Sequence, residues 1–513
     1  MSHWILAPIV LPAFLAPFIV LAARHHIAIQ RTVSLAGVVA LVGIAAALMM
    51  QVSDGSVLYY RLGDWAAPFG IVVVADRLST LMVLLTVVLA LFVLLYAVGS
   101  GWDRRGWHFH ALFQFQLMGI LGAFLTGDLF NLFVFFEVLL IASYGLMIHA
   151  GGNARLRAGV QYVLYNLLGS TLFLFALGSI YAETGTLNMA DLAERVALID
   201  PAASVGIRVA AVLLLLVFAI KAALVPLHFW LPSSYAEAPA PVAALFAIMT
   251  KVGAYAIIRV YTLVFPPDLE VTAGLHDVWL QPAALVSLAV GMIGVLAARR
   301  LDRLVAFSII GSMGMVIVAI SLFTPAGIAA ALYYIVHSTL AGAVLFLVVD
   351  LVRTGRGDLR LSAQAPMFGT ALTAGLFFAG AIAMAGLPPL SGFLGKLLVL
   401  DAAFASPLVA WVWAVVLATS LISVVGFSRA GSVLFWKAHG TPGTMLPEEA
   451  VRPAWLSYVA VGGLLALLVA HTLFAGHVHA YTLRIAGDLF APDAYIAKVL
   501  ETPGKLSTPT EGY

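Results

Sequence analysis

The stretch KAALVPLHFWLPSSYAEAPAPVAALFAIMTK, residues 221–251, sets the fold class and holds the first functional signals. Lys221 stands within an apolar run, and Pro226 and Pro232 interrupt the segment that follows. A turn rich in proline and alanine then carries one acid, Glu237, and the next apolar run contains Lys251. Irregular backbone at membrane depth is tolerated only where protein or a water-filled cavity covers it. An ionisable residue inside a membrane span is a functional-site candidate by default.

The composition of the whole chain requires a lipid environment. Of the 513 residues, 63% are hydrophobic and only 10% are charged, whereas a soluble domain is about 25% charged. Regular alternation of polar and apolar residues is absent, which argues against an outer-membrane barrel. The net charge of +2 is small and scattered, so nothing predicts nucleic-acid binding. The chain contains no cysteine, which excludes disulfides and Cys-ligated clusters.

Apolar runs long enough to cross a bilayer recur along the chain. A crossing needs about 20 apolar residues, so the predicted fold is an all-α integral membrane protein with about fourteen transmembrane helices. The N-terminal MSHWILAPIV lacks the basic region and cleavage site of a signal peptide, and we interpret it as part of the first span. The predicted spans are 4–23, 32–50, 77–99, 109–127, 129–149, 159–182, 206–234 (broken), 240–264, 279–298, 303–323, 326–350, 368–400 (broken), 406–431 and 455–475.

The basic residues predict an orientation for these spans. Of the 26 lysines and arginines, fifteen fall in odd-numbered loops, seven in even-numbered loops and the C-terminal tail, and four inside spans. Cytoplasmic loops carry the excess of basic residues. The odd loops are therefore predicted to be cytoplasmic and both termini to lie outside a bacterial inner membrane.

A weak internal repeat predicts two halves of opposite orientation. Residues 222–227 resemble residues 385–390 at an offset of 163, and both fall inside an overlong apolar segment. Matched interrupted segments in two halves indicate a transport site between inverted repeats. The predicted division is 1–107 for helices 1–3 with an extramembrane hairpin at 56–76, 108–264 for the first repeat, 279–431 for the second repeat, and 432–513 for helix 14 and an interfacial tail.

Glu137 is the acid that this pattern leaves without a local counter-charge. It lies about eight residues into the fifth span, which at 1.5 Å per residue is roughly 12 Å deep. An unpaired carboxylate at that depth must meet a cation or be protonated. Lys221 and Lys251 are the available cations in this half. Either a static Glu–Lys pair fixes helix packing, or the strength of the pair changes so that protons move.

Lys251 lies near the middle of its span, and Arg259 follows eight residues later. We expect Arg259 to extend toward the outer interface, with a packing or lipid-headgroup role. Burial favours the neutral amine of a lysine, whereas a nearby carboxylate favours the ammonium. Moving Glu137 relative to Lys221 would therefore switch Lys221 between holding and releasing a proton.

Three further residues extend the predicted proton path. His337 is central in its span, where it is either a satisfied core histidine or a proton shuttle, because imidazole titrates near neutrality. Lys396 follows the second break, in LPPLSGFLGKLLVL. His228 follows Pro226 at the cytoplasmic end of the first break, where it either passes protons toward Lys221 or satisfies freed carbonyl groups.

Motifs for other chemistries are missing from the sequence. It contains no phosphate-binding loop, no dinucleotide fingerprint and no HExxH zinc motif. The pairs His108/His110 and His477/His479 lack further ligands nearby, so we expect neither a metal nor another cofactor. No nucleophile stands with a base, and a membrane enzyme is disfavoured.

Four motifs together resemble a known family. They are DLFNLFVFFE with Glu137, the 221–251 stretch with its two lysines, the helix with His337, and GLPPLSGFLGK with Lys396. In this combination the chain resembles the antiporter-like membrane subunits, which include the proton-pumping subunits of respiratory complex I and the large subunits of Mrp-type Na⁺/H⁺ antiporters. The Glu137 helix and the short C-terminus most resemble the D-type Mrp subunits.

The resemblance implies a fourteen-helix fold with two inverted five-helix repeats, spans 4–8 and 9–13, and with interrupted seventh and twelfth helices. It also implies a charged axis across the middle of the membrane, formed by Glu137, Lys221, Lys251, His337 and Lys396. In the repeat alignment Lys221 and Lys396 stand on opposite sides of their breaks, so the sequence does not show that their roles are equivalent.

We therefore predict a proton-translocating subunit of a multisubunit monovalent cation (Na⁺)/H⁺ antiporter, with other Mrp subunits and the lipid bilayer as partners. Protons would pass along Lys251, His337 and Lys396 and be gated by Glu137 and Lys221. The first alternative is a proton-pumping subunit of a redox complex, such as complex I or a membrane-bound hydrogenase. The second is a membrane scaffold with inert buried charges.

Overall fold

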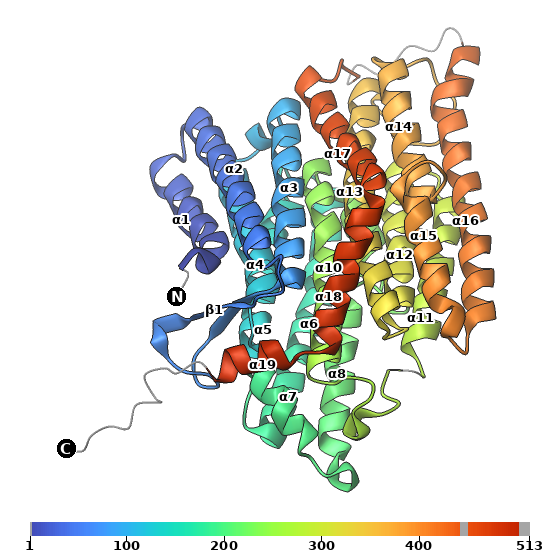
Figure 1. Ribbon diagram of the computed structural model, residues 1–513. Coiled ribbons are helices and arrows are strands. Elements are labelled where there is room, and N and C mark those ends of the chain that lie inside the picture. Colours follow the sequence, from blue (N-terminus) through green and yellow to red (C-terminus); the bar gives the residue numbers. More distant parts are fainter. Residues whose placement is uncertain (1–2, 277, 442–449, 502–513) are drawn as a thin grey trace.

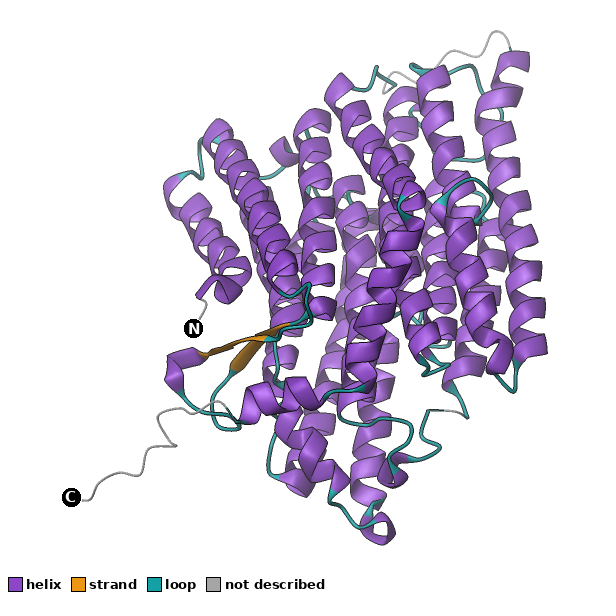
Figure 2. Cartoon of the chain, viewed as in Figure 1, coloured by secondary structure: helices purple, strands orange, loops and turns teal. Residues whose placement is uncertain are grey.

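A computed structural model describes residues 3–276, 278–441 and 450–501 of the chain. In this part of the chain the protein is a multi-pass membrane protein built from side-by-side helices (Figures 1 and 2). Eleven of the described helices are long and apolar enough to cross a bilayer. Three predicted spans fall outside that group, because 109–127 forms a helix of 17 residues and 206–234 and 368–400 are each interrupted.

The N-terminal part contains three helices and one hairpin. A short 3-10 helix, η1 (His3–Leu6), leads into α1 (Ala7–Ala22), which is followed by α2 (Ile27–Gln51) and α3 (Arg77–Ser100). Between α2 and α3, β1 (Leu58–Arg61) pairs antiparallel with β2 (Val72–Ala75), with Leu58 opposite Ala75. Asp76 then begins α3 with a capping box, in which its side chain accepts from Ser79 N at 2.8 Å.

The elements up to residue 263 include the first interrupted helix. They are α4 (Phe109–Leu125), α5 (Leu129–Met147), α6 (Asn153–Thr184), the short α7 (Met189–Ala197), α8 (Val205–Lys221), α9 (Trp230–Glu237) and α10 (Ala240–Leu263). The elements that follow are α11 (Leu280–Ala297), α12 (Leu301–Ile320), α13 (Pro325–Arg356), α14 (Thr370–Ala385), α15 (Ser391–Ala402), α16 (Val409–Gly431) and α17 (Trp455–Leu473).

The first interruption separates α8 from α9. Pro226 has no backbone N–H, and its ring would clash with the carbonyl group four residues earlier, so the helix ends before it. Ala223 adopts a positive φ of 55° there. Trp230 Nε1 donates to the Ile220 carbonyl oxygen at 3.0 Å, which also accepts from Ala223 N, and so connects the start of α9 to the end of α8.

The second interruption separates α14 from α15. Gly386 ends α14 at φ 73° in the left-handed region, where glycine avoids the penalty of a Cβ atom. Pro388 and Pro389 prevent the helix from continuing directly. The chain becomes helical again at Ser391. A Cβ atom on Gly386 would also lie 2.6 Å from Cε of Lys396, so the break is packed closely against that lysine.

Helix α10 lies at the centre of the bundle. All 24 of its residues are buried, and it contacts α3, α8, α12 and α13. The expectation that Arg259 extends to a lipid headgroup is wrong. Its side chain is only 5% exposed and forms an ion pair with Asp76 at 2.6 Å. The helix lies too deep inside the protein for an arginine on it to reach lipid.

The C-terminal part continues from α17 into α18 (Ala475–Phe490) and α19 (Asp493–Leu500). Helix α18 packs along α13 and α10, and it buries Thr482, Ile485, Ala486 and Leu489. Helix α19 contacts α7, and η1 contacts the β hairpin. Both ends of the described chain therefore lie at the same end of the bundle (Figure 1).

Candidate functional site

Glu137 on α5 is held by a neighbour on α6. Its Oε1 atom accepts a short hydrogen bond from the Ser170 hydroxyl. The residue is half-buried among Phe135, Phe136 and Val138 of its own helix. The hydroxyl therefore provides the polar contact that an acid in this apolar setting requires.

Lys221 is the last residue of α8 and is 5% exposed. Its Nζ atom donates to Asn166 Oδ1 at 3.3 Å and lies 5.8 Å from the centre of the Phe136 ring. Among the described residues, no ion pair within 4.0 Å joins Lys221 to Glu137, although Glu137 is near enough to act on Lys221 electrostatically. Instead Asn166 and Ser170, one turn apart on α6, each form a hydrogen bond with one of the two charged groups.

Lys251 is the most isolated of the predicted residues. It is 0% exposed, and neither its Nζ atom nor the neighbouring Thr250 Oγ1 has a hydrogen-bond partner among the described residues. Two residues further along α10, a Cβ atom on Gly253 would lie 2.7 Å from Ala222 N, so α10 packs directly on the end of α8. Burying an amine without a hydrogen-bond partner costs free energy. In polar buried sites such groups are usually hydrogen-bonded to internal water.

His337 on α13 is 0% exposed and faces the second interruption. Its Nδ1 atom lies 2.9 Å from Ser391 Oγ, at the start of α15. The Nε2 atom has no hydrogen-bond partner in the described part of the chain, and a Cβ atom on Gly392 would lie 2.7 Å from it. The absence of a side chain at Gly392 therefore leaves room beside Nε2.

Lys396 reaches back across the second interruption. Its Nζ atom donates to the Ala385 carbonyl oxygen at 2.6 Å and to Ser420 Oγ at 2.8 Å. Ala385 is the last residue of α14, so the ammonium group lies at the partially negative end of that helix. Lys221 precedes its break in the sequence, whereas Lys396 follows its break. In the structure, however, the amine of Lys396 bonds the end of α14, the helix before its break, and Lys221 is itself the last residue of α8, the helix before its break.

His228 lies between α8 and α9 and is 8% exposed. Its ring is 4.5 Å from that of Phe229 and interacts with the backbone of Pro226. No hydrogen bond or ion pair between described residues joins it to Lys221. The contacts observed for His228 are therefore with its own loop, at Phe229 and Pro226.

Sequence reasoning missed four partners of the charged groups: Asn166, Ser170, Ser391 and Ser420. The spacing of Asn166 and Ser170 in the apolar sixth span was a usable signal, because residues four apart share one face of a helix. Ser391 and Ser420 had no comparable signal, since serines are common in membrane helices and their partners are distant in sequence.

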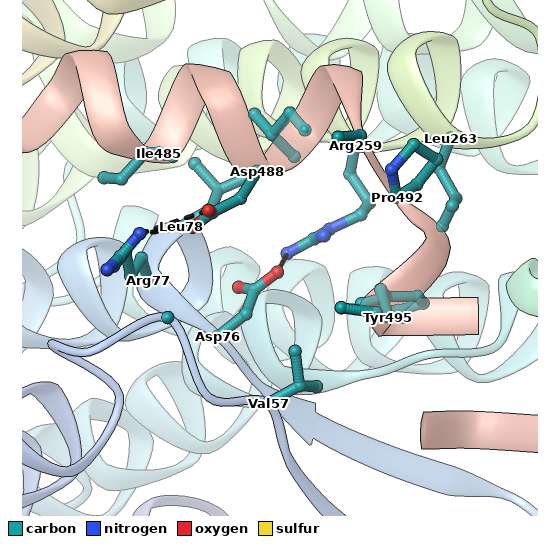
Figure 3. Close-up of a pocket in the computed structure, with 14 residues that line it drawn as sticks. Val57, Asp76, Arg77, Leu78, Arg259, Leu263, Ile485, Asp488, Pro492 and Tyr495 are labelled. Atoms are coloured by element: carbon teal, nitrogen blue, oxygen red, sulfur yellow. Dashed lines mark hydrogen bonds and ion pairs between the residues drawn. The ribbon is translucent and has the colours of Figure 1, made fainter. Parts of the chain in front are cut away.

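A pocket at the end of α10 lies apart from this site (Figure 3). It is lined by Asp76, Arg77, Arg259, Asp488 and Tyr495, among others. Arg259 pairs with Asp76 at 2.6 Å and Arg77 pairs with Asp488 at 3.0 Å. These ion pairs connect α3, α10 and α18, so we assign this pocket a structural role. No group of three or more metal-ligating side chains is present within the described ranges.

Comparison with known proteins identifies the family. The model of the family described as NADH:quinone oxidoreductase/Mrp antiporter, TM, matches residues 126–423. The chain belongs to this family. The match contains all five helices that carry the candidate residues, which are α5, α8, α10, α13 and α15.

Relatives with curated names are similar over almost the whole chain. The D-type subunit of a probable K⁺/H⁺ antiporter of Rhizobium meliloti is 36% identical, with 98% of each chain covered. The D-type subunit of a Na⁺/H⁺ antiporter of Alkalihalophilus pseudofirmus is also 36% identical, over 98% of this chain and 100% of the relative. Its Na⁺/H⁺ antiporter counterpart in Bacillus subtilis is 37% identical over the same shares.

Solved structures agree with the family assignment. A chain in the structure of the Mrp complex from Dietzia sp. superposes with a TM-score of 0.87 at 28% identity, covering 98% of this chain and 100% of that one. A chain of an archaeal membrane-bound sulfane sulfur reductase superposes with the same TM-score and coverage at 25% identity. A chain of respiratory complex I from Thermus thermophilus shares the fold, with a TM-score of 0.78 and 24% identity.

Proposed function

We propose that this chain translocates protons as a subunit of a multisubunit monovalent cation/H⁺ antiporter. One observation carries the proposal. Four titratable groups, Lys221, Lys251, His337 and Lys396, are buried in the middle of the bundle beside two interrupted helices. Buried ionisable groups of this kind mark proton relays in transporters. The names of the relatives support both Na⁺ and K⁺ as the exchanged cation.

Glu137 and Lys221 form the proposed gate. Ser170 donates to Glu137, and Asn166 accepts from Lys221, so the two charges interact across α6 without direct contact. A small movement of α6 would change the separation of the charges, and Coulomb energies inside a protein change steeply with distance. A closer carboxylate favours the protonated lysine, and a more distant one favours release of its proton.

Lys251, His337 and Lys396 form the proposed path. His337 is near enough to both lysines to interact with them electrostatically. The unpartnered Nζ of Lys251 and Nε2 of His337 are the positions where bridging water would complete the path. Ser391 and Ser420 hold His337 and Lys396 in place by hydrogen bonds.

The proposed topology has fourteen crossings. The eleven long helices contribute eleven crossings, and α4, the α8–α9 pair and the α14–α15 pair contribute three more. We propose residues 108–264 and 279–431 as inverted repeats that each contain one interruption. The basic loops would face the cytoplasm of a bacterial cell, and both ends of the chain would lie outside the inner membrane.

The proposed partners are the other subunits of an Mrp-type complex, together with the surrounding lipid. The similarity to a chain of the Dietzia Mrp complex along its entire length supports this assignment. Within that assembly we propose a transporter subunit and not an enzyme, with no cofactor of its own.

Charge-removing variants of the gate test the function. In the assembled complex, reconstituted in vesicles, Glu137→Gln or Lys221→Ala should lower the rate of Na⁺- or K⁺-driven proton exchange roughly tenfold or more. A hydrogen bond to a charged group contributes about 1.5–3 kcal/mol, and 1.36 kcal/mol corresponds to a tenfold change in rate. Glu194→Gln, on the exposed face of α7, is the control. Exchange at the wild-type rate by an assembled Glu137→Gln complex would contradict the proposal.

The second candidate is a proton-pumping subunit of a redox complex. It is favoured by one observation, the equal superposition on a chain of the sulfane sulfur reductase. Purification of the intact complex separates the two functions. Cation-driven proton exchange by a complex without redox subunits supports the antiporter, whereas copurified redox subunits support the pump. Undiminished proton movement in every charge-removing variant would favour an inert scaffold.

A further inference from the structure

His471 is a buried histidine that the proposed path does not use. It lies near the end of α17 and is 7% exposed. Its ring is tilted by 31° from that of Tyr333 on α13, with 4.3 Å between the ring centres. The ring also interacts with the Tyr333 backbone, so the atom that remains unexplained is Nε2.

The surroundings of His471 connect it to the proposed path. Tyr333 stands one turn before His337 on α13, and His471 is close enough to His337 to act on it electrostatically. A Cβ atom on Gly395 would lie 3.4 Å from the Tyr333 ring, and Lys396 is the next residue. Helix α17 also contacts both α13 and α15. His471 therefore adjoins the helices that carry His337 and Lys396.

Three polar atoms in this region have no hydrogen-bond partner among the described residues. They are His471 Nε2, the Tyr333 hydroxyl and His337 Nε2. Buried polar groups in proteins are almost always hydrogen-bonded, either to protein or to internal water. Both histidine rings also interact with backbone groups, of Ala383 and Tyr333. Three such atoms on the contacting helices α13 and α17 indicate a site for water molecules that bridge the two histidines.

Further titratable groups lie on α18 and at the end of α15. His479 on α18 is partly exposed, and its Nδ1 atom has no partner in the described part of the chain. It interacts electrostatically with Asp401, which is exposed at the end of α15. Helix α18 packs on α13, the helix that carries Tyr333 and His337, and Asp401 lies on the same helix as Lys396.

We propose that His471 transfers protons between the buried pair His337 and Lys396 and the solvent-exposed groups His479 and Asp401. In this step the Lys396 ammonium group gives a proton to a bridging water, which passes one of its own protons to the lone pair of Nε2. A lysine N–H bond therefore breaks as a histidine N–H bond forms, and the water stays neutral. Transfer of the proton through a second water to His479 or to the Asp401 carboxylate restores the neutral ring, and no electron is gained or lost. The inference rests on the proposed proton-transport function, and it adds the segment that connects the buried path with the solvent.

The test compares His471→Gln with His477→Gln in the purified complex, reconstituted in vesicles that contain a pH-sensitive dye. Glutamine keeps hydrogen-bonding capacity but does not titrate. We expect His471→Gln to lower the maximal rate of cation-driven proton exchange at least tenfold, with an unchanged apparent KM for the cation. His477 is exposed on α18 and outside the path, so its variant should keep the wild-type rate. His471→Asn is measured in parallel in case His471→Gln does not assemble.

A solvent isotope effect distinguishes proton transfer from a structural role. If His471 transfers protons, the residual rate of the His471 variants should fall further in D₂O than the wild-type rate does. Wild-type exchange by both assembled His471 variants, beside a Lys221→Ala complex that has lost exchange, would overturn this inference and leave the proposed function standing. If the Lys221→Ala complex also exchanges at the wild-type rate, the result contradicts the proposed proton-transport function, and the inference about His471 falls with it.

Discussion

At the scale of single residues, the buried charges are held by small polar side chains. Ser170 donates to Glu137, Asn166 accepts from Lys221, and Ser420 accepts from Lys396. A serine or asparagine in an apolar helix can satisfy a charge without neutralising it, whereas an opposite charge in direct contact would fix the protonation state. The proposed transport requires each buried group to gain and lose a proton, and this arrangement is compatible with that requirement.

Asn166 should therefore be as important to transport as the charged residues. In Asn166→Leu, Lys221 loses its hydrogen bond to Oδ1. Because a hydrogen bond to a charged group contributes about 1.5–3 kcal/mol, proton exchange should fall roughly 10- to 100-fold. The measurement is cation-driven exchange in vesicles. The matched control is Ser179→Ala on the exposed face of the same helix, where the hydroxyl only bonds the Phe175 carbonyl group. Equal rates of proton exchange for Asn166→Leu and Ser179→Ala would show that Asn166 is not needed for transport.

At the scale of elements, the two interruptions decide where the charges can lie. Each break follows from prolines that the sequence shows directly, at Pro226 and at Pro388–Pro389. The approximate positions of the long helices were also predictable from their apolar runs. Their ends were not, since α6 and α13 extend to Asn153–Thr184 and Pro325–Arg356, beyond the predicted 159–182 and 326–350. The hydrogen bond from Lys396 to the Ala385 carbonyl oxygen could not be predicted from the sequence, because it depends on how α15 packs against α14.

Helix α10 is fixed at one end by its arginine. Arg259→Ala would leave Asp76, whose side chain is 15% exposed, without its ion-pair partner. Losing one member of a buried pair costs roughly 3 kcal/mol or more, so the variant should unfold at a lower temperature in detergent. Arg195→Ala is the control, because the Arg195–Asp191 pair lies on a surface where the arginine is 44% exposed and contributes about 0–1 kcal/mol. Equal unfolding temperatures would contradict a structural role for the pocket in Figure 3.

At the scale of the whole molecule, one carboxylate outside the spans connects two helices that are distant in sequence. Asp103, between α3 and α4, accepts from Arg31 of α2 at 2.6 and 2.8 Å and lies 3.2 Å from His110 Nε2. Burial opposes ionisation of Asp103, but the hydrogen bonds from His110 and Arg31 outweigh it and hold its pKa below the usual range.

The lowered pKa of Asp103 predicts a pH dependence of stability. An aspartate titrates near pH 3.9 when unfolded. Since its folded pKa is lower, its stabilising contribution is complete above that value and is lost as the pH falls through the folded pKa. Asp103→Asn should therefore unfold at a lower temperature than wild type at pH 6. The difference should shrink as the pH falls below about 4. A difference that stays constant down to pH 3 would show that ionisation of Asp103 does not contribute.

The amino-acid sequence alone established the solvent of this protein, its family and five candidate residues. Apolar runs, prolines and charges within apolar runs are local features of the sequence. Their effects on membrane insertion, helix continuity and burial cost can be predicted without knowing the tertiary fold. What those charges touch depended on the tertiary fold. Asn166 bonds Lys221, Ser170 bonds Glu137, and the Lys396 ammonium group lies at the C-terminus of α14. His471 packs beside Tyr333. These contacts join helices far apart in sequence, and no local pattern encodes which faces of two apolar helices will meet.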